Sequence, residues 1–179
     1  MPLRALALGA VLVTAAVMAG TGRAGYPNNT ACTGKSLSGK FFLVPNSQGA
    51  GNVLYTLQLR NRSNRTCFVS GIPGLRLIGK TGKPLPTHVS PAHPGAMTAV
   101  KVTLKPGAYA AATARFSPDV PGPGEGHPGQ CEPTAYKLRV NPSGGGSLLA
   151  PVSPPTPVCE HGGMTLTVLI AGKHGPKTL

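Results

Sequence analysis

The chain has few acidic and aromatic residues. Its 179 residues include four Asp and Glu together, four Tyr, four Phe and no Trp. Paired-carboxylate and triad enzymes need acids placed beside a second acid, or beside a serine and a histidine. The acids form no such motif, and no Gly-x-Ser-x-Gly sequence occurs; they are Asp119, Glu125, Glu132 and Glu160. We therefore expect a protein that is not an enzyme and that binds no cofactor.

Long apolar runs are also absent, except at the N-terminus. There Arg4 is followed by an apolar run over 5–19 and by small residues, a layout that predicts a signal peptide over 1–24. Cleavage after Ala19 or after Ala24 fits this layout, and an uncleaved anchor is the alternative. No cysteine directly follows the run, which disfavours a lipid anchor. We expect a secreted or envelope protein with no transmembrane segment in its mature chain.

The rest of the chain has the length of one domain. We expect a linker over 25–31, a β-sandwich domain over 32–172 and a flexible tail over 173–179.

The four cysteines lack the close C-x-x-C spacing of a zinc site. An even number in an exported chain predicts two disulfides. A bridge between Cys67 and Cys131 would imitate an immunoglobulin domain, but no Trp lies between them and Cys131 is outside any strand pattern. Pairing of cysteines close in sequence fits the expected strands better. We therefore predict Cys32–Cys67 and Cys131–Cys159.

Alternating apolar residues, separated by turns, predict an all-β fold. The clearest run covers 52–60, with Val53, Tyr55, Leu57 and Leu59 on one face, and others cover 100–104, 136–140 and 164–170. The alanine-rich run 108–116 is too short for a good helix and is also predicted as a strand. Residues 88–95 and 117–130, and the proline-rich run after Leu149, are expected as loops. The result is an immunoglobulin-like antiparallel β-sandwich of about seven or eight strands.

Positive charge dominates the sequence. Lys and Arg number 17, which gives a net charge of +13 and predicts attraction to polyanions. The candidate anion-binding residues are Arg60, Arg62, Arg65, Arg76 and Lys80. A solvated basic surface without a dedicated ligand is the alternative. We expect a monomer whose partner is an anionic envelope polymer or another envelope protein, and no nucleic-acid binding, because the chain is exported and lacks stacking aromatics.

Histidines offer a weaker hypothesis. His88, His93 and Met97 share one predicted loop and could form a soft copper site, which would make the protein a metal carrier. Loop histidines without a metal are far commoner, so no metal site is expected.

One motif resembles a known family. The sequence N-x-S-x-x-T-C-x-x-x-G-x-P-G-x-x-L is matched by Asn61, Ser63, Thr66, Cys67, Gly71, Pro73, Gly74 and Leu77. Gly82 in a hairpin turn and the sequence Leu104-x-Pro106-Gly107 follow, and Cys32 precedes the first strand. Together these resemble domain-of-unknown-function family 4232, exported or lipid-anchored envelope proteins of high-GC Gram-positive bacteria.

The resemblance covers about 32–170 and implies a β-sandwich without an established activity. Ile72 departs from the family's usual aromatic, and the missing lipid-attachment cysteine favours a freely secreted or wall-held protein.

Overall fold

The computed structural model describes residues 30–94, 100–126 and 131–177. The predicted signal peptide and nearly all of the predicted linker lie outside these ranges. Within these ranges, a 3₁₀ turn, η1 (Gly34–Ser36), and a four-residue turn, α1 (Cys159–Gly162), accompany eleven strands. The strands are β1 (Leu37–Leu43), β2 (Val53–Asn61), β3 (Cys67–Ser70), β4 (Gly74–Gly79), β5 (His88–Pro91), β6 (Lys101–Leu104), β7 (Tyr109–Phe116), β8 (Ala135–Asn141), β9 (Leu148–Thr156), β10 (Gly163–Leu166) and β11 (Ile170–Ala171).

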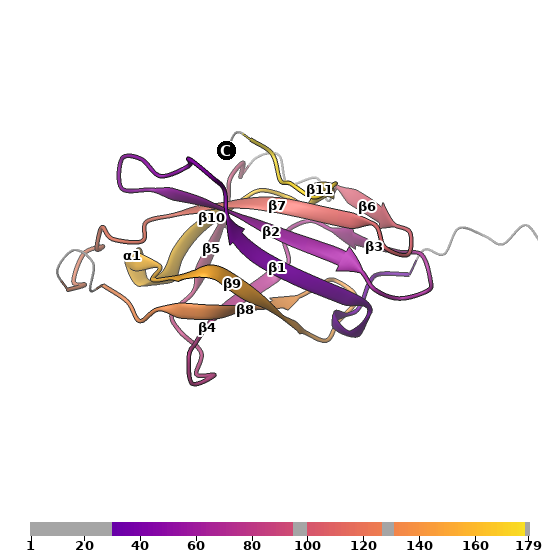
Figure 1. Cartoon of the computed structure of the whole chain (residues 1–179), viewed down its shortest axis with the longest axis horizontal. Coiled ribbons are helices and arrows are strands. Elements are labelled where there is room, and N and C mark those ends of the chain that lie inside the picture. Colours follow the sequence, from indigo (N-terminus) through magenta and orange to yellow (C-terminus); the bar gives the residue numbers. More distant parts are fainter. Residues whose placement is uncertain (1–29, 95–99, 127–130, 178–179) are drawn as a thin grey trace, which may run out of the picture.

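One long sheet curls nearly into a barrel (Figure 1). Its strand order is β4-β8-β9-β1-β2-β7-β10-β5, and β11 adds to β7. The chain after β4 turns back along that strand, where Leu85 N donates to Leu77 O at 2.9 Å, and then continues as β5. This return links the two edges of the sheet. The strands β3 and β6 form a second, small sheet, and together the two sheets confirm the all-β prediction.

The apolar alternation of β2 builds the core. Val53, Tyr55, Leu57 and Leu59 are all buried, as the sequence predicts. The Tyr55 ring lies 5.0 Å from the Phe41 ring and 5.1 Å from the Phe116 ring, centroid to centroid. Such pairs contribute roughly 0.5–1.5 kcal/mol beyond the burial of their area. The three neighbouring strands β1, β2 and β7 therefore share one aromatic cluster inside a mostly aliphatic core.

The alanine-rich run forms the strand β7, as predicted. Its alanines are fully buried because both faces of β7 are covered; they are Ala110, Ala111, Ala112 and Ala114. The core lies on one face. β11 pairs with the edge of β7, and the residues after β11 cover the other face. Residues 173–177, predicted as part of a flexible tail, are held there. Gln58 Nε2 donates to Lys173 O at 2.8 Å, and Thr113 Oγ1 donates to Pro176 O at 2.7 Å.

Three segments differ from the prediction. Residues 88–91 form β5, not a loop, because they pair in parallel with β10. The strand β3 was not predicted, although Phe68 and Val69 pair with β6. The strand β9 continues through Pro151, Pro154 and Pro155, which are exposed. Val152 and Ser153 keep their N–H groups, and they pair in parallel with β1. The sheet is thus mixed, whereas the prediction was purely antiparallel.

The two disulfides join the predicted pairs. Cys32 and Cys67 have Cα atoms 5.0 Å apart, and Cys131 and Cys159 have Cα atoms 5.4 Å apart. The first pair pins the segment before β1 to β3, and the second pins the segment before β8 to α1. In the described ranges, no helix has the length and apolar character required to cross a bilayer.

Candidate functional site

The two ends of the barrel differ in their acidic side chains. The strands β2, β6 and β8 end on the same side. The Asn61 side chain at the end of β2 bonds Leu104 O at the end of β6. The start of β1 lies beside Asn61, and just before it Gly34 N donates to Gly145 O in the turn after β8, at 3.0 Å. We call this side the basic end (right in Figure 1). Its loops and turns expose Lys35, Arg62, Arg65 and Lys105. All four acids of the chain lie in the loops at the opposite side, the acidic end, near α1 and the end of β7.

Buried Asn61 shapes the basic end. Its side-chain amide Nδ2 donates to Leu104 O at 2.9 Å and to Arg65 O at 2.7 Å. Its Oδ1 accepts bonds from the backbone N and the hydroxyl of Ser63, at 3.0 and 2.7 Å. Asn61 is 0% exposed and fully satisfied. The loop that carries Arg62 and Arg65 therefore has one fixed shape.

Arg60 belongs to a second basic group on the outer face of β2 and β7. The Arg60 guanidinium lies 5.5 Å from the centre of the Tyr109 ring, and Lys173 Nζ lies 5.3 Å from it. The strand β11 brings Lys173 there, because Gly172 N donates to Tyr109 O at 2.9 Å. Tyr109 thus holds two cations from distant parts of the chain close together.

The five predicted anion-binding residues do not form one patch. Arg62 and Arg65 lie together at the basic end, with Arg60 close to them at the end of β2. Arg76 lies on β4, separated from β2 by β8, β9 and β1. Lys80 lies beyond the end of β4, on the side of the acidic end, because β4 starts beside Asn141 at the basic end. The geometry of the sheet therefore divides the set.

A hollow of about 480 Å³ opens at the basic end, beside the Cys32–Cys67 disulfide. Cys67 and Ala31 line it together with polar residues: Thr30, Thr33, Ser36, Ser63, Arg65 and Thr66. Its volume falls within the roughly 300–1,000 Å³ that is usual for ligand sites. It combines hydroxyl groups with a positive charge, which suits a polar anion.

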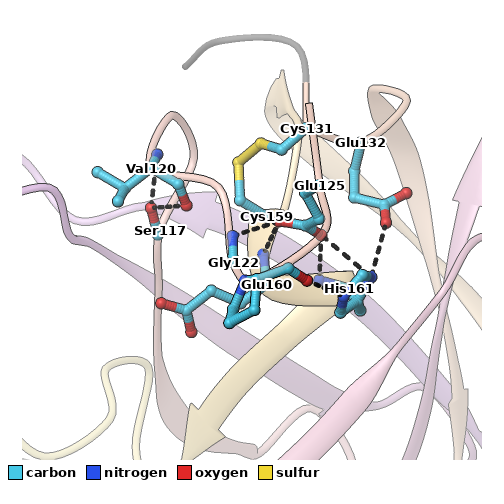
Figure 2. A network of polar contacts seen from close by, with 10 residues as sticks. Ser117, Val120, Gly122, Glu125, Cys131, Glu132, Cys159, Glu160 and His161 are labelled. Carbon is cyan, nitrogen blue, oxygen red and sulfur yellow. Dashed lines mark hydrogen bonds and ion pairs between the residues drawn. A yellow bond between two sulfur atoms is a disulfide. The ribbon is translucent and has the colours of Figure 1, made fainter. Parts of the chain in front are cut away.

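At the acidic end, the carboxylate of Glu125 is surrounded by backbone N–H groups (Figure 2). Oε2 accepts from Gly122 N at 2.6 Å and from Glu160 N at 2.7 Å, and Oε1 accepts from His161 N. Glu160 and His161 have left-handed backbone angles, with φ of 54° and 57°. That conformation turns successive N–H groups to one side and makes a site for an anion. Glu125 fills this site itself.

Glu132 and His161 complete this group. His161 Nδ1 lies 3.4 Å from Glu125 Oε1 and 3.9 Å from Glu132 Oε1. Burial would raise the pKa of Glu125, but the hydrogen bonds from the three amides and the charge of His161 lower it overall. Burial, and then the negative charge of Glu125, raise the pKa of Glu132. These two carboxyls and the imidazole could each offer one ligand to a cation. The Glu125 carboxylate already accepts three hydrogen bonds from backbone N–H groups, which favours a structural role for this group of residues.

The structure separates the two histidines of the predicted copper trio. His88 begins β5, and His93 lies beyond its end. The strand residues 88–91 alone span roughly 10 Å, with His88 at one end and His93 beyond the other. Met97 lies outside the described residues. The two described histidines of the trio therefore do not lie side by side.

The sequence was compared with protein families, curated proteins and solved structures. A family model described as "Domain of unknown function (DUF4232)" matches residues 32–169. The chain belongs to the DUF4232 family. No curated protein and no solved structure matches it significantly. In this DUF4232 domain, the motif residues have structural tasks: Asn61 and Ser63 shape the loop, Cys67 forms a disulfide, and Gly71 has the left-handed φ of 64°.

Sequence reasoning missed part of the site. Lys173 was assigned to a tail, and only the short pairing of β11 with β7 brings it to Tyr109. The hydroxyls of the hollow come from two segments about thirty residues apart, joined by the Cys32–Cys67 disulfide. The predicted disulfide was the one available signal that these segments meet.

Proposed function

We propose that this protein is a secreted, non-catalytic binding module that attaches to anionic polymers of the cell envelope through its basic end. The observation that carries the proposal is the absence of Asp and Glu from the basic end. Lys35, Arg62, Arg65 and Lys105 are exposed at that end of the barrel, and all four Asp and Glu side chains of the chain lie at the other, where lysines accompany them. A polyanion that approaches the basic end meets cations without nearby acids to oppose them.

Two further features support an extracytoplasmic, non-catalytic role. Disulfides persist in oxidising compartments, and this chain pairs all four of its cysteines. Its N-terminal sequence has the layout of a signal peptide. The carboxylate with the most hydrogen bonds in Figure 2, Glu125, is held by backbone amides and is therefore a poor candidate for a general base.

Charge reversal at each end tests the proposal. The first variant carries Arg60, Arg62 and Arg65→Glu, and the matched control carries Lys80, Lys83 and Lys137→Glu, at the acidic end. Both lose the same net charge. Purified walls of a high-GC Gram-positive bacterium are mixed with each protein at rising salt, and the retained fraction is measured.

We expect the wild type and the control to be retained at low salt and released by moderate salt, because salt screens exposed charges. The basic-end variant should stay in solution. If both variants lose retention on the walls equally, net charge alone explains the binding and the basic end has no special part in it. Retention that ignores both salt and the basic-end substitutions would refute the proposal.

A further inference from the structure

The hollow at the basic end offers hydroxyl groups that the protein does not use itself. Ser36 Oγ donates to Thr33 O at 2.8 Å, and Ser63 Oγ bonds Asn61, so these two hydroxyls have structural tasks. The Thr33 hydroxyl also has a structural task, because it accepts from Ser36 N in the capping box of η1. In contrast, the hydroxyls of Thr30 and Thr66 bond no other group within the described part of the chain. Two free donor–acceptor groups in one hollow suit a ligand that itself carries hydroxyls.

Positive charge surrounds these hydroxyls. Arg65 lines the hollow directly. Arg62 begins the same loop, and its backbone N donates to Ser36 O at 2.9 Å, which places it beside the lining residues. Lys35 lies within η1, next to Ser36. A ligand for this hollow therefore needs negative charge as well as hydroxyls.

The walls of the hollow are fixed before any ligand arrives. The Cys32–Cys67 disulfide joins its two sides, and Cys32 N donates to Phe68 O at 2.8 Å. Thr33 N donates to Ser36 Oγ at 2.9 Å, and Asn61 holds Arg65 O. A preformed site loses less conformational entropy on binding than a mobile loop does.

We infer that this hollow recognises a hydroxylated phosphodiester, that is, a polymer whose phosphates are joined by polyol or sugar units. The inference rests on the proposed function and adds selectivity to it. Phosphates pair with Arg65 and with the neighbouring Arg62 and Lys35, and Arg is well suited to phosphate geometry. The free threonine hydroxyls bond the hydroxyls between the phosphates. The positive charges are enough to bind a polyanion, and the threonine hydroxyls make the hollow selective for a polyanion that carries hydroxyls.

Two soluble probes separate charge from hydroxyl recognition. Poly(glycerol phosphate) has hydroxyls between its phosphates, and linear polyphosphate has none. Both are titrated calorimetrically, at equal phosphate concentration and low ionic strength, into the wild type, Thr30→Val/Thr66→Val and the matched control Thr81→Val/Thr134→Val. The control threonines lie in the turn after β4 and before β8, away from the hollow.

We expect the wild type and the control to bind poly(glycerol phosphate) about tenfold more tightly than polyphosphate, since two hydrogen bonds of ordinary strength give this ratio. The Thr30→Val/Thr66→Val variant should lose the preference and keep its affinity for polyphosphate. Equal binding of both polymers by the wild type would overturn the selectivity and leave the proposed function standing. Binding of neither polymer would overturn both.

Mapping on the wild type keeps the test independent of the folding of the variant. Backbone amide signals of Thr33, Ser36 and Thr66 should shift during titration with poly(glycerol phosphate), and those of Thr81 should stay in place. Shifts centred elsewhere, such as around Tyr109, would contradict this location.

Discussion

The side-chain amide of Asn61 lies 2.9 Å from the backbone oxygen of Leu104, and this bond ties the end of β2 to the end of β6. The same amide group reaches Arg65 O, and its oxygen accepts from Ser63. One buried side chain thus connects the large sheet, the small sheet and the loop of the basic end. The asparagine and serine of the family motif are explained by this arrangement.

Asn61→Ala should therefore destabilise the fold strongly. It leaves Leu104 O and Arg65 O without their buried donor, and each such loss costs about 1–3 kcal/mol. We expect the free energy of unfolding to fall by roughly 2–4 kcal/mol in urea titrations. Exposed Asn64, three residues along, is the matched control, and Asn64→Ala should change stability by less than about 0.5 kcal/mol. Similar effects of both substitutions would contradict the role of Asn61.

The two disulfides should contribute similarly to stability and differently to binding. Their sequence separations are 35 and 28 residues, which correspond to about 3–4 kcal/mol each in the chain-entropy model. Cys32→Ala/Cys67→Ala should lose that stability together with the preference for poly(glycerol phosphate), because the hollow loses its pinned wall. Cys131→Ala/Cys159→Ala should lose a similar stability and keep the preference. Scanning calorimetry measures the stability of each variant, and calorimetric titration below its melting temperature measures its binding. Loss of binding in the second variant would contradict a binding site at the basic end.

The sequence was sufficient for the parts of the fold that depend on local pattern. The alternation from Val53 to Leu59 predicts β2, and the short alanine run predicts β7 because turns limit its length. The disulfides followed from the order of strands and cysteines. Net charge could also be read directly from composition.

The remainder depends on contacts that no local pattern records. The strand β9 forms in spite of Pro151, Pro154 and Pro155 because β8 and β1 lie on either side of it. Residues 88–91 became β5 through a parallel partner far along the chain. The division of the five predicted basic residues follows from strand direction, which places Arg62 and Lys80 at opposite ends. Propensity cannot supply this information, because pairing partners and strand direction are tertiary properties.

Glu132→Gln should stabilise the protein at neutral pH and lose this advantage in acid. The Glu132 side chain is 13% exposed and lies beside the Glu125 carboxylate, and its pKa is raised. A raised carboxyl pKa means that the folded state favours the proton. The stability that protonated Glu132 contributes is therefore complete at low pH and is lost as pH rises through the folded-state pKa of Glu132. Gln is neutral throughout and keeps a donor that can bond Glu125.

We expect the melting temperature of Glu132→Gln to exceed that of the wild type by roughly 1–3 °C at pH 7, with the gap closing below the pKa of Glu132. Scanning calorimetry across this pH range provides the measurement. Exposed Glu160→Gln is the charge-matched control. A gap that is independent of pH, or that has the opposite sign at pH 7, would refute the carboxyl interaction.

Gly175→Ala should release the C-terminal segment from β7. A Cβ atom at this position would collide with Thr113 Oγ1 and with the backbone of Ala112 and Thr113, so residues 173–177 must move. The bond from Thr113 to Pro176 O and the bond from Gln58 to Lys173 O would then be weakened. Trypsin cleaves after lysine, and cleavage after Lys173 requires the chain there to detach locally from β2 and β7, where Lys173 O and Pro176 O are bonded. We expect cleavage there to be about tenfold faster in the variant, which corresponds to about 1.4 kcal/mol less protection.

Gly49→Ala is the control, because a Cβ there meets nothing within 4 Å. Equal cleavage rates in the wild type and in Gly175→Ala would show that close packing on β7 does not hold the segment, and Lys173 would then have no fixed place beside Tyr109.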